Sequence, residues 1–483
     1  MRQIVVFYVI KPYLCQRIVL VMYEFLDLIN SYLWGWPMIV MLVGTHLFLT
    51  IRLRFPQRHI FKAIRISVKR DKGADGDVSQ FSALATGLAA TIGTGNIIGV
   101  ATAVTMGGPG AVFWCWLTGI LGIATKYSEG LLAVKYRVKT KDGQMRGGPM
   151  YAIERGMKCK WLAVAFAVFT FIASFGIGCV TQSNAISVAM SEYGFDPIVI
   201  GGLLAVMLTL VIIFGVKGIA KVCEMLVPFM AIFYIIGCVI VLCINAPYIW
   251  PAVKVIVSSA FSEQAATGGF VGSTLMLAMR YGIARGLFSN EAGLGSAPIV
   301  AAAARTKNPV RQALVSSTSV FWDTVIICAM TGLVLVSTIL SPNGVDSTSG
   351  AELTKRAFGQ IPLMIGDLNI GSLMLSVAIF TFAFSTILGW SYYGEKALEY
   401  LCGSYYRIGR IVFRMLFILV TFGGAIWAVE VVWSFGDCAN ALMAIPNLIC
   451  LICLSGVLVR ETRKYLWEDR LDQESDDETP TIG

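Results

Sequence analysis

The chain has 483 residues, of which 57% are hydrophobic and only 14% are charged, and its mean hydropathy is +0.73. Soluble domains carry roughly 25% charged residues, so this composition excludes an ordinary soluble protein and predicts an all-α integral membrane protein in a lipid bilayer. The formal net charge of +9 does not indicate a nucleic-acid partner, because the basic residues lie in short stretches between apolar runs.

Taken in chain order, eleven apolar stretches are long enough to cross the hydrocarbon core, which takes about 20 helical residues. They cover residues 32–51, 81–105, 111–134, 161–190, 196–215, 221–245, 268–303, 310–340, 371–396, 408–428 and 431–458. The sequence therefore predicts about 11 transmembrane helices.

Positive charge is distributed unevenly between the loops on the two sides. One set, together with the flanking Arg52, holds 29 of the 38 Lys and Arg residues. This set comprises residues 53–72, 135–160, 216–221, 304–311, 396–414 and the C-terminus. Because positive loops face the cytoplasm, we predict a multi-pass protein of the cell inner (plasma) membrane with a cytoplasmic C-terminus.

The two ends of the chain differ from the rest. Residues 1–21 are apolar but are interrupted by Lys11, Pro12 and Arg17, and they lack the core and cleavage site of a signal peptide. We interpret them as a mis-called extension that precedes a true start at Met22. The C-terminal LDQESDDETPTIG is typical of a solvated, disordered tail.

Two of the predicted spans are interrupted by glycine. The second contains ATGLAATIGTGNIIG and the seventh contains GIARGLFSNEAGLGSAP. If the first span is set aside, these two segments begin the first and the second set of five helices. Because five is an odd number, the second set is inverted, and paired broken helices in such a repeat mark a transporter's binding site. Close helix packing is the alternative explanation for the glycines.

The predicted organisation follows from these features. Residues 22–80 form an extra first transmembrane helix and a basic cytoplasmic loop, 81–245 the first five-helix repeat, 246–458 the second repeat, and 459–483 a cytoplasmic acidic tail. At each break the freed N–H and C=O groups of the unwound backbone need hydrogen-bond or ion partners inside the membrane. A zwitterionic amino acid and a cation provide them, because N–H groups attract a carboxylate and freed carbonyls bind Na⁺.

Several blocks of sequence resemble the alanine or glycine:cation symporter family. They are TGLAATIGTGNIIGVATA, GGPMYAIERG, GIARGLFSNEAGLGSAPIVAAAA and FSTILGWSYYGEKALEYL, and the match extends from about Phe25 to Arg460. The resemblance implies a LeuT-type fold with ten core helices in two inverted fives and one extra N-terminal helix. It also implies sodium-coupled transport of small neutral amino acids.

The same resemblance implies which residues bind. The substrate carboxylate is expected at the N–H groups around Thr94, Gly95 and Asn96, and Na⁺ at the carbonyls of Ala89 and Ile92 and the hydroxyls of Ser385 and Thr386. Hard cations favour such neutral oxygen ligands, although Ser and Thr in membrane helices often bond to their own helix instead.

Further candidates come from polar and aromatic side chains inside the spans. Gln182 interrupts an apolar span, so it contacts either the substrate or another helix. Phe288 and Trp390 are predicted to close the pocket around a small side chain, with ordinary packing as the alternative. Arg285 and Glu291 flank the second break and are interpreted as a gate or brace.

Other charged residues also lie inside the spans. Lys126 and Glu129 are three residues apart on one helix, a spacing that predicts a pair. Asp323 and Asp437 are the acids that would carry protons if protons replace Na⁺ as the coupling ion.

We therefore predict a sodium-coupled symporter that imports alanine and glycine by alternating access. Its partners are a small neutral amino acid, Na⁺ and the lipid bilayer, with no nucleic acid and no cofactor beyond Na⁺ as coupling ion. A proton-coupled carrier on the same fold and, less favoured, a channel are the alternatives. An enzyme is not expected, because neither an HExxH zinc motif nor a GxSxG elbow is present.

Overall fold

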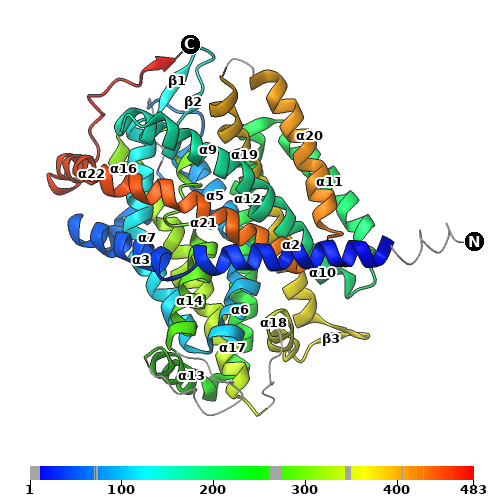
Figure 1. The fold of residues 1–483 in the computed structure, drawn as a ribbon. Coiled ribbons are helices and arrows are strands. Elements are labelled where there is room, and N and C mark those ends of the chain that lie inside the picture. The colour runs from blue at the N-terminus through cyan, green and yellow to red at the C-terminus, as the bar shows by residue number, and fades with distance from the viewer. Residues whose placement is uncertain are drawn as a thin grey trace, which may run out of the picture.

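The computed structural model describes residues 11–69, 71, 74–261, 275–342, 350–403, 406–427 and 429–482. The helices of the first half are α2 (Lys11–Leu33), α3 (Trp36–Arg52), α4 (Ile60–Ser67), α5 (Gln80–Thr91), α6 (Val100–Gly107), α7 (Gly110–Lys135), α8 (Pro149–Tyr151), α9 (Lys160–Ala173), α10 (Thr181–Ser191), α11 (Pro197–Ile212) and α12 (Gly215–Ile244). Those of the second half are α13 (Ala246–Ser259), α14 (Leu275–Asn290), α15 (Pro298–Ala301), α16 (Pro309–Val320), α17 (Ala329–Leu340), α18 (Gly350–Gly359), α19 (Ile370–Cys402), α20 (Tyr406–Gly424), α21 (Val429–Cys453) and α22 (Ser455–Thr462). Figure 1 shows their arrangement.

Short π-helical segments interrupt or extend several of these helices. They are η3 (Gly95–Gly99), η4 (Ala152–Gly156), η5 (Ser174–Val180), η6 (Phe321–Cys328) and η8 (Arg463–Trp467), while η2 (Pro56–His59) is a 3₁₀ turn. The strands are β1 (Val138–Thr140), β2 (Met145–Arg146), β3 (Met364–Ile365), β4 (Leu368–Asn369) and β5 (Thr481–Ile482). π-helical turns are rare in proteins, and those that occur are often found at functional sites. We therefore expect the functional site near η3, η5 and η6 in the centre of the bundle.

The structure contains helices that are long and apolar enough to cross a membrane. Five meet this description singly: Lys160–Ser191, Gly215–Ile244, Pro309–Leu340, Ile370–Cys402 and Trp433–Cys453. Two bent pairs meet it together, Val21–Leu33 with Trp36–Arg52 at 47° and Gln80–Thr91 with Gly95–Gly107 at 50°. The count of eleven spans and the inverted repeat stay predictions.

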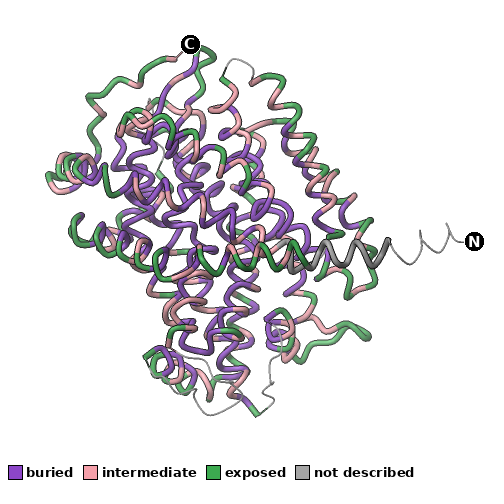
Figure 2. The backbone as a smooth tube through the Cα atoms, in the orientation of Figure 1, coloured by how far each residue is buried: buried purple, intermediate pink, exposed green. Residues whose placement is uncertain are grey.

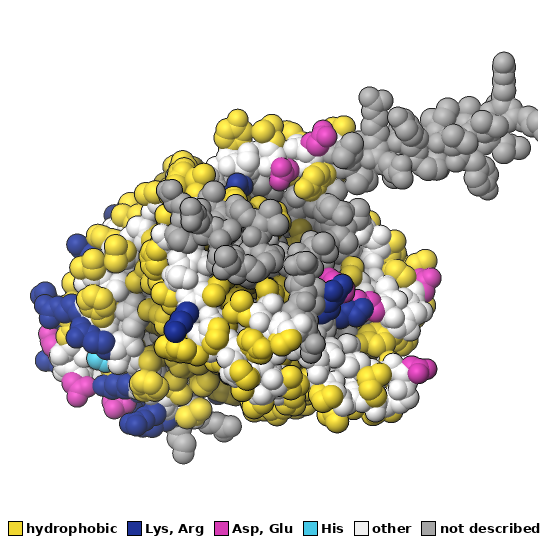
Figure 3. All heavy atoms as spheres, turned by 90° about the horizontal axis from the view of Figure 1, so that it is seen from below, with side chains coloured by type: hydrophobic (Ala, Val, Ile, Leu, Met, Phe, Trp, Pro, Cys, Tyr) yellow, Lys and Arg dark blue, Asp and Glu magenta, His cyan; other side chains and the backbone are white. Residues whose placement is uncertain are grey.

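The surface is that of a protein surrounded by lipid. Buried residues fill the centre of the bundle (Figure 2), and hydrophobic side chains cover much of the face seen in Figure 3. Over the whole described surface, Phe214 and Met225 are each 73% exposed, and Trp250 is 65% exposed. Large apolar side chains exposed in this number are costly in water and stable in hydrocarbon.

The N-terminal helix packs on the core near its C-terminal end. The side chain of Asn30 donates to the Ser434 carbonyl at 2.9 Å, and the indole of Trp34 donates to the Asp437 carbonyl at 3.2 Å. Helix α2 begins at Lys11 and runs through the boundary expected at residue 21. The start at Met22 stays a prediction.

The acidic tail is ordered, so the prediction of a disordered tail is wrong, while most of its side chains are exposed to solvent as predicted. We call residues 469–482 the tail strap. The side-chain amide of Asn308 donates to the carbonyls of Leu471 and Gln473, each at 2.9 Å. The Leu471 side chain is buried, and β5 pairs in parallel with β1 at the end of the strap. The strap thus covers the end of the bundle at the top of Figure 1, here called the tail face.

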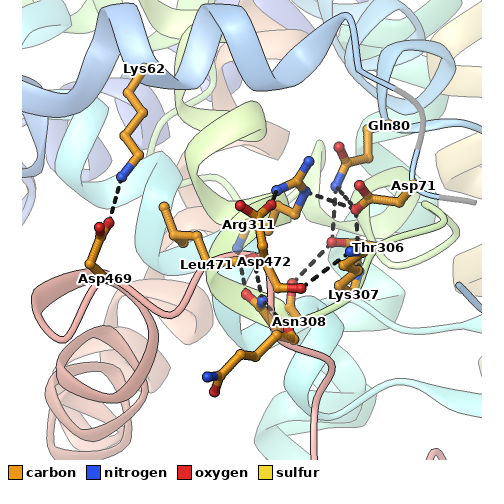
Figure 4. Close-up of polar contacts among 11 residues, drawn as sticks. Lys62, Asp71, Gln80, Thr306, Lys307, Asn308, Arg311, Asp469, Leu471 and Asp472 are labelled. Atoms are coloured by element: carbon orange, nitrogen blue, oxygen red, sulfur yellow. Dashed lines mark hydrogen bonds and ion pairs between the residues drawn. The ribbon is translucent and has the colours of Figure 1, made fainter.

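Ion pairs hold the strap to basic segments far away in the sequence (Figure 4). Arg311 contacts Asp472 at 2.7 Å and also Asp71 at 2.8 Å, and Lys62 contacts Asp469 at 3.0 Å. Composition alone predicts that an acidic segment stays in solvent without fixed contacts. Here neighbouring basic residues form ion pairs with the acidic side chains of the strap. The strap therefore links the loop before α5, the start of α16 and the C-terminus.

Candidate functional site

The first broken helix carries its polar contacts at the break. Helix α5 ends at Thr91 and the chain resumes as η3 at Gly95. The Gly93 N–H donates to Oδ1 of Asn96 at 2.9 Å, and the Thr94 N–H donates to Oε1 of Gln182 at 3.3 Å. Side chains thus accept from backbone donors that the helix no longer satisfies. The predicted substrate residues Thr94, Asn96 and Gln182 therefore lie together.

Glycine at position 93 permits a close approach between three helices. A Cβ there would lie 2.5 Å from Thr386 Oγ1 and 3.3 Å from Gln182 Oε1. The broken helix therefore meets both α10 and α19 at one residue that has no side chain. Gly93 was part of the predicted break but not of the predicted binding residues, although it stands in the same TIGTGN stretch.

The predicted sodium ligands lie at this junction. The hydroxyls of Ser385 and Thr386 both reach the Ala89 carbonyl at 3.1 Å, and they also reach the Phe382 carbonyl of their own helix at 2.8 and 3.1 Å. Ile92 is the C-cap of α5 with ψ of 90°, so its carbonyl turns away from the helical direction. A cluster of neutral oxygens at a helix break is suited to Na⁺.

The aromatic candidates lie on two helices, with Phe288 against the first break and Trp390 in contact with the second. Phe288 is 4% exposed, and its ring is 3.0 Å from the position that a Cβ on Gly95 would take. Trp390 is fully buried, and its indole N–H donates to Oε1 of Glu291 at 2.9 Å. Each ring has a glycine neighbour, Gly95 for Phe288 and Gly178 for Trp390, and the role of both rings as pocket walls stays a prediction.

The second broken helix is held by carboxylates. Beyond α14, positive φ values at Glu291, Gly293 and Gly295 (54°, 100° and 82°) turn the chain before α15. Glu129 Oε1 accepts from the N–H groups of Gly293 and Gly295 at 2.9 and 3.1 Å. A carboxylate that accepts backbone N–H groups acts here as the substitute for the missing helical bonds.

The charges predicted to pair on α7 are both buried. Lys126 Nζ lies 4.0 Å from Glu129 Oε2, and it donates to the Glu291 carbonyl at 3.2 Å. The Glu291 carboxylate also accepts from the Ser296 hydroxyl. Lys126 and Glu129 thus contact the second break from the neighbouring helix α7.

Arg285 pairs with Asp437 on another helix. Its two terminal nitrogens contact the two carboxylate oxygens of Asp437, each at 3.1 Å. Its guanidinium lies 5.8 Å from the ring centres of Phe288 and Trp433, which stack at 5.5 Å. Arg285 and Glu291 therefore belong to separate contacts on either side of Phe288, and their role as gate or brace stays a prediction.

Cavities approach the centre from both directions. One of about 390 Å³ ends at Arg285, Trp433 and Asp437. The other, of about 560 Å³, lies toward the tail face and is lined by Asp77 and Lys396, among others. Burial raises the pKa of the Asp77 carboxyl, while a hydrogen bond from the Met145 N–H opposes the change. Neither cavity is lined by a residue predicted to bind substrate, so the centre is closed to both.

Comparison with known proteins identifies the family. A model of the sodium:alanine symporter family matches residues 19–479. The chain belongs to this family. It is 47% identical over 446 residues to the sodium/alanine symporter AgcS of Methanococcus maripaludis, which covers 90% of this chain and 96% of that one. It is 35% identical over 457 residues, 92% of each chain, to a putative sodium/proton-dependent alanine carrier protein, YrbD, of Bacillus subtilis.

The fold of this family member is also seen in a distant transporter. The crystal structure of MhsT in complex with L-phenylalanine matches with a TM-score of 0.54 and 14% identity, over 84% of this chain and 94% of that one. This likeness shows a LeuT-type fold. Family and fold are those of secondary transporters rather than enzymes, and the protein is a multi-pass membrane protein of a family of amino-acid symporters.

Proposed function

We propose that this family member imports alanine and glycine together with Na⁺ by alternating access across the inner (plasma) membrane. The observation that carries the proposal is the oxygen cluster of Ala89, Ser385 and Thr386, with both hydroxyls 3.1 Å from the same carbonyl. The cluster joins the first broken helix to α19. A cation bound there would hold the break in place while substrate binds beside it.

The proposed substrate site lies one turn away from that cluster. The carboxylate is expected at the N–H groups of residues 94–96, and the Thr94 N–H now donates to Gln182. Phe288 and Trp390 would enclose the substrate side chain. Walls this bulky favour a hydrogen or a methyl group over a branched side chain, with each extra methylene worth about 1–3 kcal/mol of discrimination.

The orientation follows from the distribution of charge. The tail face carries basic segments such as Lys135, Lys139 and Arg311, and the tail strap contacts all three. Basic loops remain in the cytoplasm, so we place the tail face and the C-terminus there. Arg285 and Asp437 then close the site toward the outside.

Uptake into proteoliposomes tests the proposal. Labelled alanine should accumulate under an inward Na⁺ gradient and should not accumulate with K⁺ in its place. Thr386→Ala removes one oxygen of the cluster and should reduce the Na⁺-driven accumulation. Thr381→Ala on the same helix is the matched control, because that hydroxyl donates to Val377 and Ala378 of its own helix. Equal effects of the two substitutions would contradict the sodium site.

A proton-coupled carrier is the second candidate, and buried Asp323 favours it. This carboxylate lies next to the first break, where Asn96 donates to it at 2.7 Å. Accumulation driven by a pH gradient at zero Na⁺, and lost in Asp323→Asn, would replace Na⁺ with H⁺ as the coupling ion. No alanine uptake from folded protein under either gradient would contradict the proposed substrate.

A further inference from the structure

The cavity at the tail face lies outside the proposed binding centre. Its volume is about 560 Å³, and none of the residues proposed to bind substrate or Na⁺ lines it. Figure 1 shows the end of α19 and the beginning of α20, which both border it, at this face. Basic residues outnumber acidic residues in its lining by five to three, and they are Lys217, Arg305, Lys396, Arg410 and Arg414.

Two of these cations have an acidic partner and three do not. Arg414 contacts Glu395 at 2.7 Å, and Lys396 contacts Glu399 at 2.7 Å. Within the part of the chain that the structure describes, the other three form no ion pair with a carboxylate oxygen within 4.0 Å, and they are Lys217, Arg305 and Arg410. Uncompensated positive charge therefore lies around this cavity.

The remaining acids of the lining do not offset that charge completely. Asp77 accepts from the Met145 N–H at 2.9 Å, and Asp142 is exposed at the turn between β1 and β2. Two carboxylates thus stand against three unpaired cations. Helix α12 adds to the positive potential, because its first residue, Gly215, lines the cavity and no side chain caps this helix end. Free N–H groups at the start of a helix favour an anion.

The mouth of the cavity lies at the apolar surface. Ile213 and Phe214 line it and are 62% and 73% exposed. On α20, Ile411 and Met415 each follow an arginine of the lining and are 62% and 61% exposed. Helices α11 and α20 pack side by side, so these apolar side chains border the basic cavity. A soluble anion would leave them uncovered, whereas a lipid would cover them with its acyl chains.

We propose that this cavity binds the headgroup of an anionic phospholipid from the leaflet at the tail face. The phosphate would lie among Lys217, Arg410 and the first N–H groups of α12, with the acyl chains on the apolar side chains of α11 and α20. Lysine and arginine recognise phosphate, and basic pockets between membrane helices bind anionic headgroups. This inference rests on the proposed orientation, because the cytoplasmic leaflet is the anionic one. It does not depend on the identity of the substrate or of the coupling ion.

A lipid bound here would strengthen a junction that the protein already forms. A Cβ on Gly215 would lie 3.9 Å from a terminal nitrogen of Arg414, so the start of α12 adjoins α20. Arg414 in turn contacts Glu395 near the end of α19. A phosphate on Lys217 and Arg410 would bridge α12 and α20 beside these contacts. Because the junction exists only in the folded protein, the lipid should raise the melting temperature.

Native mass spectrometry of the full-length protein in detergent tests the inference, with phosphatidylglycerol and phosphatidylcholine of the same acyl chains offered at equal concentration. Wild type should retain one phosphatidylglycerol in preference to phosphatidylcholine. Lys217→Gln and Arg410→Gln should each weaken its binding about fivefold, and the double variant about 25-fold. Lys221→Gln and Arg407→Gln are the matched controls on the same two helices, because both side chains are exposed and neither lines the cavity.

The other outcomes overturn the proposal in different ways. Equal retention of phosphatidylcholine would mean that apolar contact alone holds lipid, and an equal loss in the control pair would mean a general effect of surface charge. Displacement of phosphatidylglycerol by millimolar inorganic phosphate would make a free anion the ligand. Should the double variant not fold, the two single variants decide by affinity. A failure of alanine uptake would concern the proposed function alone, because this measurement uses neither substrate nor gradient.

Discussion

Replacing Gly93 by alanine is the sharpest perturbation that the structure offers. The added Cβ would lie 2.5 Å from Thr386 Oγ1 and 3.3 Å from Gln182 Oε1, so at least the hydroxyl must move. Thr386 Oγ1 now reaches the Ala89 carbonyl at 3.1 Å, and a displaced hydroxyl opens the proposed sodium cluster. Overpacking of this kind costs about 1–3 kcal/mol. If this cost falls on Na⁺ binding, the Na⁺ concentration for half-maximal uptake rises about 5- to 150-fold.

The assay is the Na⁺ concentration that gives half-maximal alanine uptake in proteoliposomes. Gly87→Ala is the matched control on the same helix, because a Cβ there meets nothing closer than 4.0 Å. We expect Gly93→Ala to shift the Na⁺ dependence and Gly87→Ala to leave it unchanged. An unchanged Na⁺ dependence in Gly93→Ala, or an equal shift in both variants, would refute the reasoning from close approach.

Three other perturbations address the remaining contacts. Arg285→Gln removes the counter-charge of Asp437, whose side chain is only 19% exposed, so the protein should lose at most about 3 kcal/mol of stability and its melting temperature should fall. Adding Asp437→Asn should restore part of this stability, and no recovery would contradict the pairing. Trp390→Phe removes the indole donor to Glu291 and widens the proposed pocket, so valine should inhibit alanine uptake about tenfold more strongly. Unchanged inhibition by valine would mean that the Trp390 ring does not form a wall of the pocket. Deleting the tail strap exposes the surface that it covers and should lower the melting temperature, whereas an unchanged value would mean that the strap adds no stability.

The broken helices were the part of the site that the sequence predicts best. Glycine and polar residues inside an apolar span have few explanations in a bilayer, where every freed backbone group needs a partner. The structure places Thr94, Asn96 and Gln182 at the first break, with Ser385 and Thr386 against it. Hydropathy located the break and the family resemblance named Thr94, Asn96, Ser385 and Thr386, while the binding roles of these residues stay predictions.

The partners across the bundle were not predictable in the same way. Arg285 is six residues from Glu291 but pairs with Asp437, which lies 152 positions away in the sequence. The turn at Glu291, with φ of 54°, directs its carboxylate to Trp390 instead. Ser289 follows Phe288 directly, yet only the fold brings it to Asp323. Such pairs depend on how helices pack, and spacing along one helix does not contain that information.

The tail was mispredicted for a related reason. Composition describes how an acidic segment behaves when it is alone in water, and on that basis solvation is correct. Asp472, however, meets Arg311, while the Asn308 amide fixes the backbone on both sides of it. Order in the strap comes from these complementary groups on other segments rather than from its own sequence.

The first break also suggests how substrate enters a site that is already satisfied. The Thr94 N–H, expected to bind the substrate carboxylate, donates instead to Gln182 Oε1 across 3.3 Å, and the Gln182 amide nitrogen donates to the Ile177 carbonyl at 3.1 Å. A bond of this length between neutral groups is weak, whereas a carboxylate forms a shorter, charge-assisted bond with the same donor. Substrate can therefore replace the glutamine oxygen with a net gain. If substrate binds at Thr94 as we propose, the Gln182 oxygen would give up this donor, and substrate binding would be linked to the position of η5 and α10.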